Sequence, residues 1–457
     1  MHISIETLLT IWEVEVHNVS DRTSFNRLNI VYIREFETGS VGDGNELYFV
    51  VYEDNPKEEG WYTNAFDRAK NIPKLRQRSD IVFVVDGRVS DSDMHGLKYL
   101  RVPDVFLAID QLREHVLSTT NPMVVGVTGS VGKTTTTAMI QSILSGQFEC
   151  GRIYSKRLTP LNLSSWIVNY LDPSHQVLCL EYSMYRPHHI EALTRILKPR
   201  VGVMLNIKRV HLGVFGINTL LDIREAKRSL VEKAETAVLN VDDPLVVSLK
   251  RRGDLTFSFT DHCADAFLES DGEEALIRLN FTNQSIRFRP YVRTDLFYYQ
   301  SLASALTASF LGVPAEAISG ALNQFRPAEN RIRWIAVRGE TFLFDGDATY
   351  AGRLSALAEN RYSTSILLIV EFNFGEENVS LQAEDLSGVF GQFSEVRVLD
   401  SQVNQEALSR YRIRNCSLVS KEQFLHGVSS FEFKVIHFGI YFRRYKDLGH
   451  LTTFLGA

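Results

Sequence analysis

Cysteine is scarce in this chain and is never clustered. The 457 residues contain four cysteines, none of which belongs to a CxxC pair; they are Cys150, Cys179, Cys263 and Cys416. A disulfide framework and a zinc site are therefore both unexpected. Separate thiols in a reducing compartment are the simplest interpretation.

Long apolar runs and blocks of like charge are missing as well. No apolar stretch approaches the roughly 20 residues of a membrane-spanning helix, and the segment Met1–Thr7 lacks the basic start and apolar core of a signal peptide. The net charge is -6, and lysine and arginine are scattered. These absences argue against membrane insertion and nucleic-acid binding. We expect a soluble cytoplasmic protein that is by default a monomer. An acidic substrate would have to bind at a local basic site, because the net charge of the chain does not attract it.

The order of strand-like and helical segments predicts an α/β protein of three domains. A smaller N-terminal α/β domain is expected at residues 1–120, with strands at 47–52 and 81–85. The turn-rich segment 118–122 is the expected linker. The central domain is expected at 121–330, and a smaller C-terminal α/β domain at 331–457.

The central region alternates short apolar runs with helical segments. This rhythm predicts a largely parallel sheet flanked by helices on both faces, with ligands beyond the carboxyl ends of the strands. The expected strands are 123–127, 177–181, 201–206 and 237–240, and the expected helices are 133–145, 187–197 and 222–233. Hairpins are expected from 257 to 291. One apolar helix face is expected after them, formed by Leu296, Tyr299, Ala303, Leu306 and Phe310.

A glycine-rich loop joins the first central strand to the first helix. It reads Thr128, Gly129, Ser130, Val131, Gly132, Lys133, Thr134, Thr135. Glycines let backbone N–H groups approach phosphate oxygens, and the helix N-terminus adds a favourable dipole. Lys133 is expected on the β- and γ-phosphates, and the Thr134 hydroxyl on Mg²⁺. Val127 stands where the general P-loop pattern has its first glycine.

Further segments, taken in order with this loop, resemble the Mur ligase family. They are Leu158–Asn162 (TPxN), Leu180–Met184 with its strand-end glutamate, Leu205–Leu212 (TNIxxxHL), Arg224–Lys227 (the AK helix) and Leu239–Pro244 (LNxDDP). The order of the three domains is most similar to the MurF type. The resemblance implies an ATP-dependent ligase that forms ADP and joins a carboxylate to an amine through an acyl phosphate.

The resemblance also implies roles for individual residues. It places one Mg²⁺ on Thr134 and Glu181 and a second on His211, so two ions are expected. It implies that Lys227 is carbamylated and steadies the second ion, although a solvated helix face is the alternative for this residue. It implies a catalytic role for Asn206 beside Lys133, His211 and Lys227, whereas Asp242 and Asp243 also make a good turn by themselves.

The adenine-binding and C-terminal segments depart from the family pattern. The family's HNxxN segment is replaced by Leu296–Gln300, so Gln300 is the expected adenine contact, and Tyr298 or Tyr299 is expected to stack on the base. A plain packing helix is the alternative. Arg331 is expected at the γ-phosphate and Asp345 at the ribose once the domains close. The identity of the carboxylate and of the amine therefore stays open.

Three interpretations remain at this stage. The first is a MurF-like ligase of peptidoglycan precursor synthesis, with small-molecule carboxylate and amine substrates. The second is a Mur-type ligase of another small-molecule pathway. The third is a catalytically weak nucleotide-binding scaffold.

Overall fold

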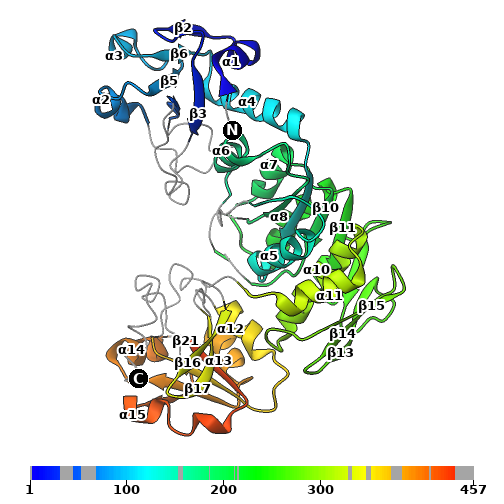
Figure 1. Cartoon of the computed structure of the whole chain (residues 1–457). Coiled ribbons are helices and arrows are strands. Elements are labelled where there is room, and N and C mark those ends of the chain that lie inside the picture. Colours follow the sequence, from blue (N-terminus) through cyan, green and yellow to red (C-terminus); the bar gives the residue numbers. More distant parts are fainter. Residues whose placement is uncertain are drawn as a thin grey trace. The chain divides into compact units, whose positions relative to one another are not determined.

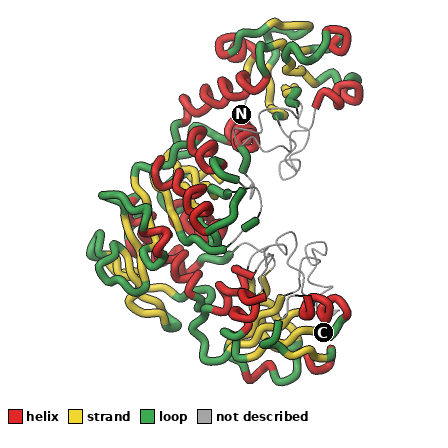
Figure 2. Tube along the Cα trace, turned by 180° about the vertical axis from the view of Figure 1, so that it is seen from behind, coloured by secondary structure: helices red, strands yellow, loops and turns green. Residues whose placement is uncertain are grey.

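The computed structural model consists of helices and strands in three sheets (Figures 1 and 2). It describes residues 3–30, 45–52, 68–152, 158–184, 186–209, 212–213, 216–327, 332–345, 351–371, 383–410 and 413–437. The chain divides into two compact units. The first contains 1–126, 147–202 and 232–235, and the second contains 127–146, 203–231 and 236–457. The α/β class predicted from the sequence is confirmed.

The N-terminal sheet has six strands in the order β1-β3-β4-β5-β6-β2. Strands β3 to β6 are parallel, and the short β1 and β2 pair antiparallel at the edges. The strand bounds are β1 Ile3–Ser4, β2 Glu15–His17, β3 Ser24–Asn29, β4 Asn45–Phe49, β5 Ile81–Val85 and β6 Tyr99–Arg101. The helices are α1 Ile5–Ile11, η2 Arg68–Asn71, α2 Ile72–Leu75, α3 Asp91–Met94 and α4 Val105–Thr120.

The expected linker at 118–122 is mostly helical, which corrects the prediction. Helix α4 continues through Thr120 and is closed by Asn121 in the left-handed conformation. The hydroxyls of Thr119 and Thr120 each donate to the carbonyl of Val116 at 2.9 Å. Threonine side chains that bond back to the preceding turn are compatible with a last helical turn, so turn-forming composition was misleading here.

The central sheet has nine strands in the order β15-β14-β13-β12-β11-β10-β7-β9-β8. The pairs β8–β9, β11–β12 and β12–β13 are parallel, and β13, β14 and β15 form the expected hairpins. The strands are β7 Met123–Thr128, β8 Cys150–Arg152, β9 Val177–Glu181, β10 Val201–Met204, β11 Thr236–Asn240, β12 Leu255–Ser258, β13 Ala266–Asp271, β14 Ala275–Leu279 and β15 Gln284–Phe288. The helices are α5 Lys133–Leu144, α6 Pro160–Tyr170, α7 His189–Ile196, α8 Leu220–Lys233, α9 Pro244–Val247, α10 Asp295–Phe310 and α11 Ala315–Gln324.

Helix α10 is buried on nearly every side, and not only along the predicted apolar face. Residues 297–298 and 300–309 are buried, whereas Leu296, Tyr299 and Phe310 of the predicted face are only partly buried. Serine and threonine at 301, 304, 307 and 309 broke the apolar pattern, yet all four are buried. The hydroxyl of Ser301 is satisfied by the preceding turn, because its Oγ donates to the carbonyl of Phe297 at 2.9 Å.

The C-terminal sheet has six strands in the order β16-β17-β21-β18-β19-β20. Strands β16 and β17 form an antiparallel hairpin, and the remaining pairs are parallel. The strands are β16 Ile332–Val337, β17 Glu340–Asp345, β18 Ser365–Ile369, β19 Glu395–Leu399, β20 Ser417–Val419 and β21 Phe433–His437. The helices are α12 Ala351–Ala358, α13 Ala383–Phe390, α14 Gln402–Arg410, α15 Lys421–Phe424 and η4 Val428–Ser430.

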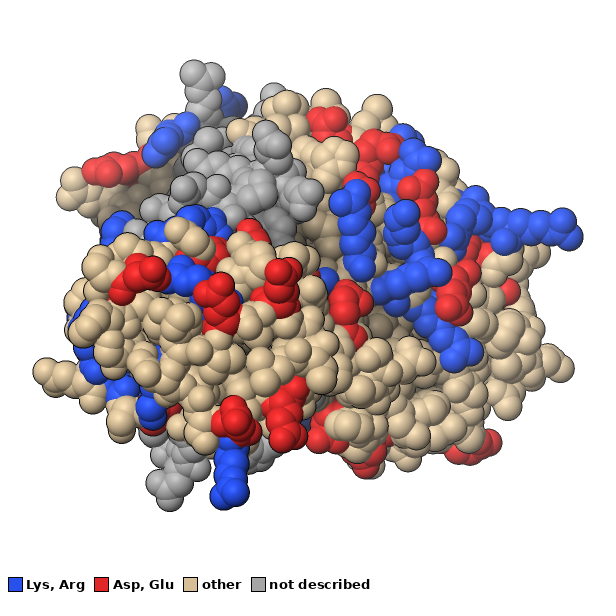
Figure 3. Space-filling view, turned by 90° about the horizontal axis from the view of Figure 1, so that it is seen from above, with Lys and Arg blue, Asp and Glu red and all other residues tan. Residues whose placement is uncertain are grey.

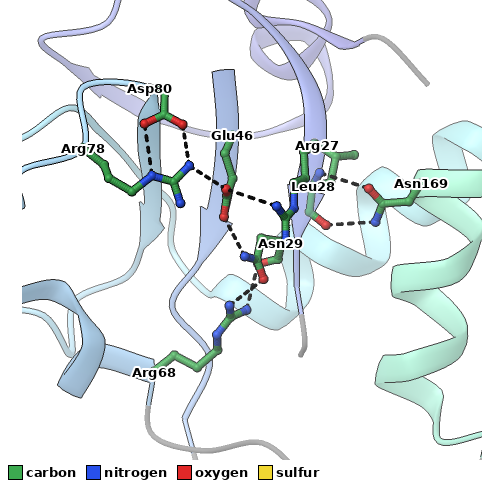
Figure 4. Close-up of polar contacts among 8 residues, drawn as sticks. All are labelled: Arg27, Leu28, Asn29, Glu46, Arg68, Arg78, Asp80 and Asn169. Carbon is green, nitrogen blue, oxygen red and sulfur yellow. Dashed lines mark hydrogen bonds and ion pairs between the residues drawn. The ribbon is translucent and has the colours of Figure 1, made fainter. Parts of the chain in front are cut away.

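A buried polar network holds the end of β3 against β4 and η2 (Figure 4). Glu46 on β4 is 3% exposed and accepts from Asn29 at 2.6 Å and from Arg78 at 3.1 Å. Arg68 donates to the carbonyls of Asn29 at 2.7 Å and Ile30 at 2.6 Å. Burial lowers the pKa of Arg68. The hydrogen bonds of Glu46 and Arg68 offset part of the cost of burying these charges and fix the local backbone.

The β3 strand is also tied to α6. The side-chain amide of Asn169 accepts from the N–H of Leu28 at 3.0 Å and donates to the carbonyl of Leu28 at 2.9 Å. Asn169 thus pairs with one residue of β3 in the way that a neighbouring strand would (Figure 4). Since α6 begins within the TPxN match, this contact joins the N-terminal sheet to that segment.

Basic and acidic side chains are interspersed on the face seen in Figure 3. This mixture agrees with the scattered lysines and arginines of the sequence. None of the helices in the described part of the chain has the length and apolar character needed to cross a membrane.

Candidate nucleotide-binding site

Two glycines allow the phosphate loop to turn between β7 and α5. Gly129 and Gly132 have φ angles of +155° and +94°. A Cβ on Gly129 would lie 3.0 Å from the Cβ of Leu205, and one on Gly132 would lie 2.9 Å from the Nε2 of Gln300. Both positions therefore require glycine, for backbone conformation and for space.

Asn206 braces this loop from the strand-end segment after β10. Its Oδ1 accepts from the N–H groups of Ser130 at 3.1 Å and Val131 at 2.9 Å, and its Nδ2 donates to the carbonyl of Val131 at 3.1 Å. The N–H of Ser130 also lies 3.0 Å from the carbonyl of Asn206. Asn206 is 7% exposed. A buried amide with three bonds to one loop holds that loop in a single conformation.

Ser130 also ties the phosphate loop to the segment after β10, through Lys208. Its Oγ donates to the carbonyl of Lys208 at 3.1 Å and accepts from the N–H of Lys208 at 2.9 Å. Asp243 supports the other side of the segment, because its Oδ2 accepts from the N–H of Ile207 at 2.7 Å. The segment 205–208 is thus held by side chains from two motifs.

Lys133 and Lys227 meet at one carbonyl oxygen. Each donates from its Nζ to the carbonyl of Gly129 at 3.0 Å, and Lys133 also donates to the carbonyl of Ser130 at 3.3 Å. Lys227 is 2% exposed. The solvated-face alternative for Lys227 is therefore wrong. Two ammonium groups at a single oxygen make this end of the loop favourable for an anion.

The N-terminus of α5 supplies backbone donors beside these two lysines. The helix begins at Lys133, and its N-cap, Gly132, offers no side chain to the first turn. The first N–H groups of a helix have no acceptor within the helix, and the helix dipole favours a negative charge there. The arrangement is suited to phosphate oxygens.

Gln300 lies directly against this helix start. Its Nε2 donates to the carbonyl of Gly132 at 3.2 Å, and the residue is 3% exposed. This contact brings α10 to the phosphate loop. The contact itself is with protein backbone, and the role of Gln300 toward a base stays a prediction.

The two tyrosines before Gln300 have different surroundings. Tyr298 is 0% exposed and donates to the carbonyl of Asp271 at 2.6 Å, so the prediction that it stacks on a base is wrong for this residue. Tyr299 stacks on Phe259 with ring centroids 3.8 Å apart and donates to Asp242 at 2.9 Å. One face of its ring is therefore already covered.

Asp242 is saturated by protein donors, and a wide depression lies beside it. It accepts from Ser258, Thr260, Tyr299 and the N–H of Phe259. Burial by itself raises the pKa of Asp242, but these hydrogen bonds outweigh it and lower the pKa below its ordinary value. The residue shapes the turn after β11, as its turn interpretation predicts.

The depression beside Asp242 is also lined by Lys250, Asp295 and Arg361.

The predicted metal ligands lie partly outside the described residues. Glu181 ends β9 in the first compact unit, and its Oε1 accepts from the Oγ of Ser183 at 2.7 Å. Thr134 lies in the first turn of α5, in the second unit. His211 and Arg331 lie outside the described residues, and for Asp345 only its place at the end of β17 is described. Within the described residues, no group of three or more His, Cys, Asp or Glu side chains is placed to hold a metal.

Two supporting residues were not singled out as site residues from the sequence. Asn240 donates from Nδ2 to the carbonyl of Leu205 at 2.9 Å, and Leu205 is the residue that faces both loop glycines. The LNxDDP match contains Asn240, so the signal was present. The motif alone does not show that Asn240 holds the end of the neighbouring strand, because its partner Leu205 lies 35 residues away in sequence.

Comparisons with known proteins agree with this geometry. The family model for the Mur ligase middle domain matches residues 127–291. A UDP-N-acetylmuramoyl-tripeptide--D-alanyl-D-alanine ligase of Synechocystis sp. is 30% identical over 194 residues, which cover 41% of each chain. The chain spans between about two fifths and half of the length of the first curated relatives that it matches.

Solved structures match over a longer stretch. MurF from Acinetobacter baumannii covers 100% of this chain with a TM-score of 0.75 at 18% identity, and 99% of the MurF chain is covered. MurF ligase from Thermotoga maritima in complex with ADP covers 90% of this chain with a TM-score of 0.70 at 20% identity, and 95% of that chain is covered. At these identities the match establishes the fold. Residues 127–291 are therefore similar to the Mur ligase middle domain, and the chain shares its fold with the solved MurF structures.

Proposed function

We propose that this protein is an ATP-dependent ligase that joins a carboxylate to an amine through an acyl phosphate and releases ADP and phosphate. The observation that carries the proposal is the convergence of Lys133 and Lys227 on the carbonyl of Gly129, at the start of α5. The brace from Asn206 keeps this loop in one conformation. A rigid loop with Lys133 at the start of a helix is suited to phosphoryl transfer, where catalysis is mainly positioning and charge stabilisation.

In this proposal, Lys133 turns from the loop carbonyls to the β- and γ-phosphates when ATP binds. The helix N-terminus contributes the N–H groups of Lys133, Thr134 and Thr135. Asn206 holds the loop so that these donors do not have to be reorganised during the reaction. Gln300 keeps its amide at Gly132 and faces the base, while Arg331 and Asp345 complete the nucleotide site on closure.

Magnesium fits the proposed donor set. Thr134 and Glu181 are each proposed as a ligand of Mg²⁺, since hydroxyl and carboxylate oxygens are the hard ligands that Mg²⁺ prefers. His211 would hold a second ion. Bound magnesium neutralises charge on the transferring phosphoryl group.

Lys227 is proposed to react with CO₂ and form a carbamate. Its burial at 2% exposure and its sharing of one carbonyl with Lys133 both disfavour a second ammonium at this place. A carbamate exchanges that cation for an anion, so Lys133 gains an opposite charge nearby. This change also creates an oxygen ligand for the second magnesium ion.

The proposed substrates are a small-molecule carboxylate and an amino-acid or peptide amine. A role in peptidoglycan precursor synthesis, in the cytoplasm, is the specific form that the curated relatives suggest. The changed segments at Leu296–Gln300 and in the C-terminal region support a relative with other substrates equally well.

Phosphate release, measured with ATP, Mg²⁺ and a panel of carboxylates and amines, tests the proposal. We expect release that requires one member of each class and disappears in Lys133→Ala. ATP binding without turnover for every pair would contradict the ligase and support the scaffold. Thr137→Ala serves as a control on the same helix, because its hydroxyl donates back to the carbonyl of Lys133 at 2.9 Å.

A further inference from the structure

The start of α10 is paired with the chain segment that follows α12. Thr294, the N-cap of α10, forms an antiparallel bridge with Asn360. The N–H of Asp295 donates to the carbonyl of Glu359, and the N–H of Arg361 donates to the carbonyl of Arg293, each at 2.9 Å. The central-sheet helix α10 is therefore joined by backbone hydrogen bonds to the region that carries the C-terminal sheet.

Arg361 adds a charged link at the same junction. Its Nε lies 2.9 Å from Oδ1 of Asp295 and 3.1 Å from Oδ2 of Asp271. The side chain of Asp295 is 25% exposed. The side chains of Arg361 and Asp271 are 40% and 46% exposed, so removal of the arginine would take away the cation that both carboxylates share.

A second cation strengthens the junction from the residue before the N-cap. Arg293 forms an ion pair with Glu432, and its guanidinium lies 4.3 Å from the ring centroid of Tyr362. Tyr362 in turn stacks on Phe433 of β21 with ring centroids 4.5 Å apart. The residue before the N-cap of α10 is thus tied to side chains that lie beside β18 and β21.

The same helix reaches the phosphate loop within two turns. Gln300 lies about 7.5 Å along the helix axis from Asp295, and its Nε2 bonds to the carbonyl of Gly132 at 3.2 Å. Helix α10 is buried along almost its whole length, and a tightly packed interior transmits a displacement with little local relaxation. A displacement of Asp295 should therefore move Gln300 and, through its hydrogen bond, the carbonyl of Gly132.

We propose that Arg361 is a positioning residue that sets the phosphate loop through α10. By holding the first turn of α10 to Asp271 and Asp295, it keeps Gln300 against the carbonyl of Gly132. The inference rests on the proposed function in one respect, namely that the loop binds ATP. The position of the C-terminal region and the geometry of the nucleotide site are coupled through this one helix.

A double-mutant cycle with Arg361→Ala and Gln300→Ala tests the coupling, with Mg-ATP binding measured by calorimetry. We expect Arg361→Ala to weaken binding by roughly 3- to 10-fold, the scale of couplings within one contact network. The double variant should bind no more weakly than the weaker single variant. The matched control is Arg287→Ala, which removes an exposed arginine paired with Glu274 at 3.1 Å in the same compact unit; its binding should equal that of the wild type.

Additive losses in the cycle, or wild-type binding by Arg361→Ala, would overturn the inference. If Arg361→Ala does not fold, Arg361→Lys and Asp271→Asn replace it in the cycle and are judged by the same two outcomes. Arg361→Lys should recover part of the affinity because it keeps the charge.

Hydrogen exchange separates this inference from the proposed function, because it needs no nucleotide. In the protein without ATP, amide exchange of residues 129–136 should be faster in Arg361→Ala than in the wild type and unchanged in Arg287→Ala. Unchanged exchange in Arg361→Ala would refute the coupling. Failure of the wild type to bind Mg-ATP would count against the proposed function instead.

Discussion

At the scale of single residues, the candidate site depends on groups whose roles come from their neighbours. Asn206 braces the loop because its amide faces two N–H groups and one carbonyl. Asp242 is a stronger acid than usual but has its oxygens filled by protein donors. Asn206 and Asp242 are both polar residues that follow a strand, yet one holds the phosphate loop and the other shapes a turn. The local contacts of each residue decide which role it has.

Gly132→Ala should destabilise the loop and abolish Mg-ATP binding. Its φ of +94° is unfavourable for alanine, and the new Cβ would lie 2.9 Å from Nε2 of Gln300. We expect a cost of about 1–3 kcal/mol in unfolding free energy, measured by denaturant titration. Gly320→Ala in α11 is the control, since no atom lies within 4 Å of its Cβ position; this variant should be stabilised by about 0.5–1 kcal/mol. Normal ATP binding by Gly132→Ala would contradict the assigned geometry.

Lys227 should carry a carbamate in the resting protein. Native mass spectrometry at alkaline pH should show the added mass of CO₂, which disappears on acidification and is absent from Lys227→Arg. The arginine variant keeps a cation but cannot be carbamylated, so phosphate release should fall by more than about tenfold, the scale on which general electrostatic contributions are measured. An unmodified Lys227 with full activity in CO₂-depleted buffer would refute this role.

At the scale of elements, the alternation of strands and helices was readable from the sequence because buried parallel strands are continuous apolar runs. The bounds of β9 and most other central elements follow those runs closely. The contacts that turn strand ends into a site were not readable in the same way. The pairing of Lys227 with Gly129 spans 98 residues, and that of Gln300 with Gly132 spans 168; neither contact was predicted from the sequence.

Asp243 links two elements, and Asp243→Ala should disturb both. Its Oδ1 caps α9 through the N–H groups of Leu245 and Val246, and its Oδ2 holds Ile207. Loss of a cap and of a buried acceptor should cost about 1–3 kcal/mol in unfolding free energy and weaken Mg-ATP binding through segment 205–208.

Ser90→Ala is the matched control for Asp243→Ala. Ser90 caps α3 by accepting from the N–H of Asp93 at 3.2 Å. Its loss should lower stability by about 1 kcal/mol without changing Mg-ATP affinity. Equal affinity losses in the two variants would show that stability alone, and not the position of Ile207, determines binding.

At the scale of the whole molecule, the fold is the part that the sequence predicted best. Each of the three predicted domain ranges contains one sheet. The sequence pattern did not reveal that the first turn of α10 would be built into the C-terminal region. That junction consists of backbone bonds and ion pairs between segments that carry no motif, and such contacts leave no periodic signal.

The junction predicts a pH dependence of stability. Burial raises the pKa of Asp295 to about 6, while Arg361 opposes the shift and Glu359 and Asp271 add to it. Because the folded-state pKa lies above the ordinary value of 3.8, ionisation of Asp295 opposes folding. This cost grows as the pH rises from about 4 to about 6 and is constant above that range.

Thermal unfolding of Asp295→Asn and of the wild type, compared between pH 4 and pH 7, measures this cost. The variant should gain stability relative to the wild type as the pH rises through this window. His189 contributes in both proteins, since burial lowers its pKa to about 4, so its effect cancels in the difference. A constant difference across the window would contradict the assignment.

The amide of Asn169 has a consequence for how the protein behaves in solution. An unpaired strand edge recruits other strand edges and promotes aggregation. By bonding to both backbone groups of Leu28, Asn169 covers part of β3 that the two-residue strand β1 does not reach. The side chain that joins the N-terminal sheet to α6 therefore also protects the folded chain from edge-to-edge self-association.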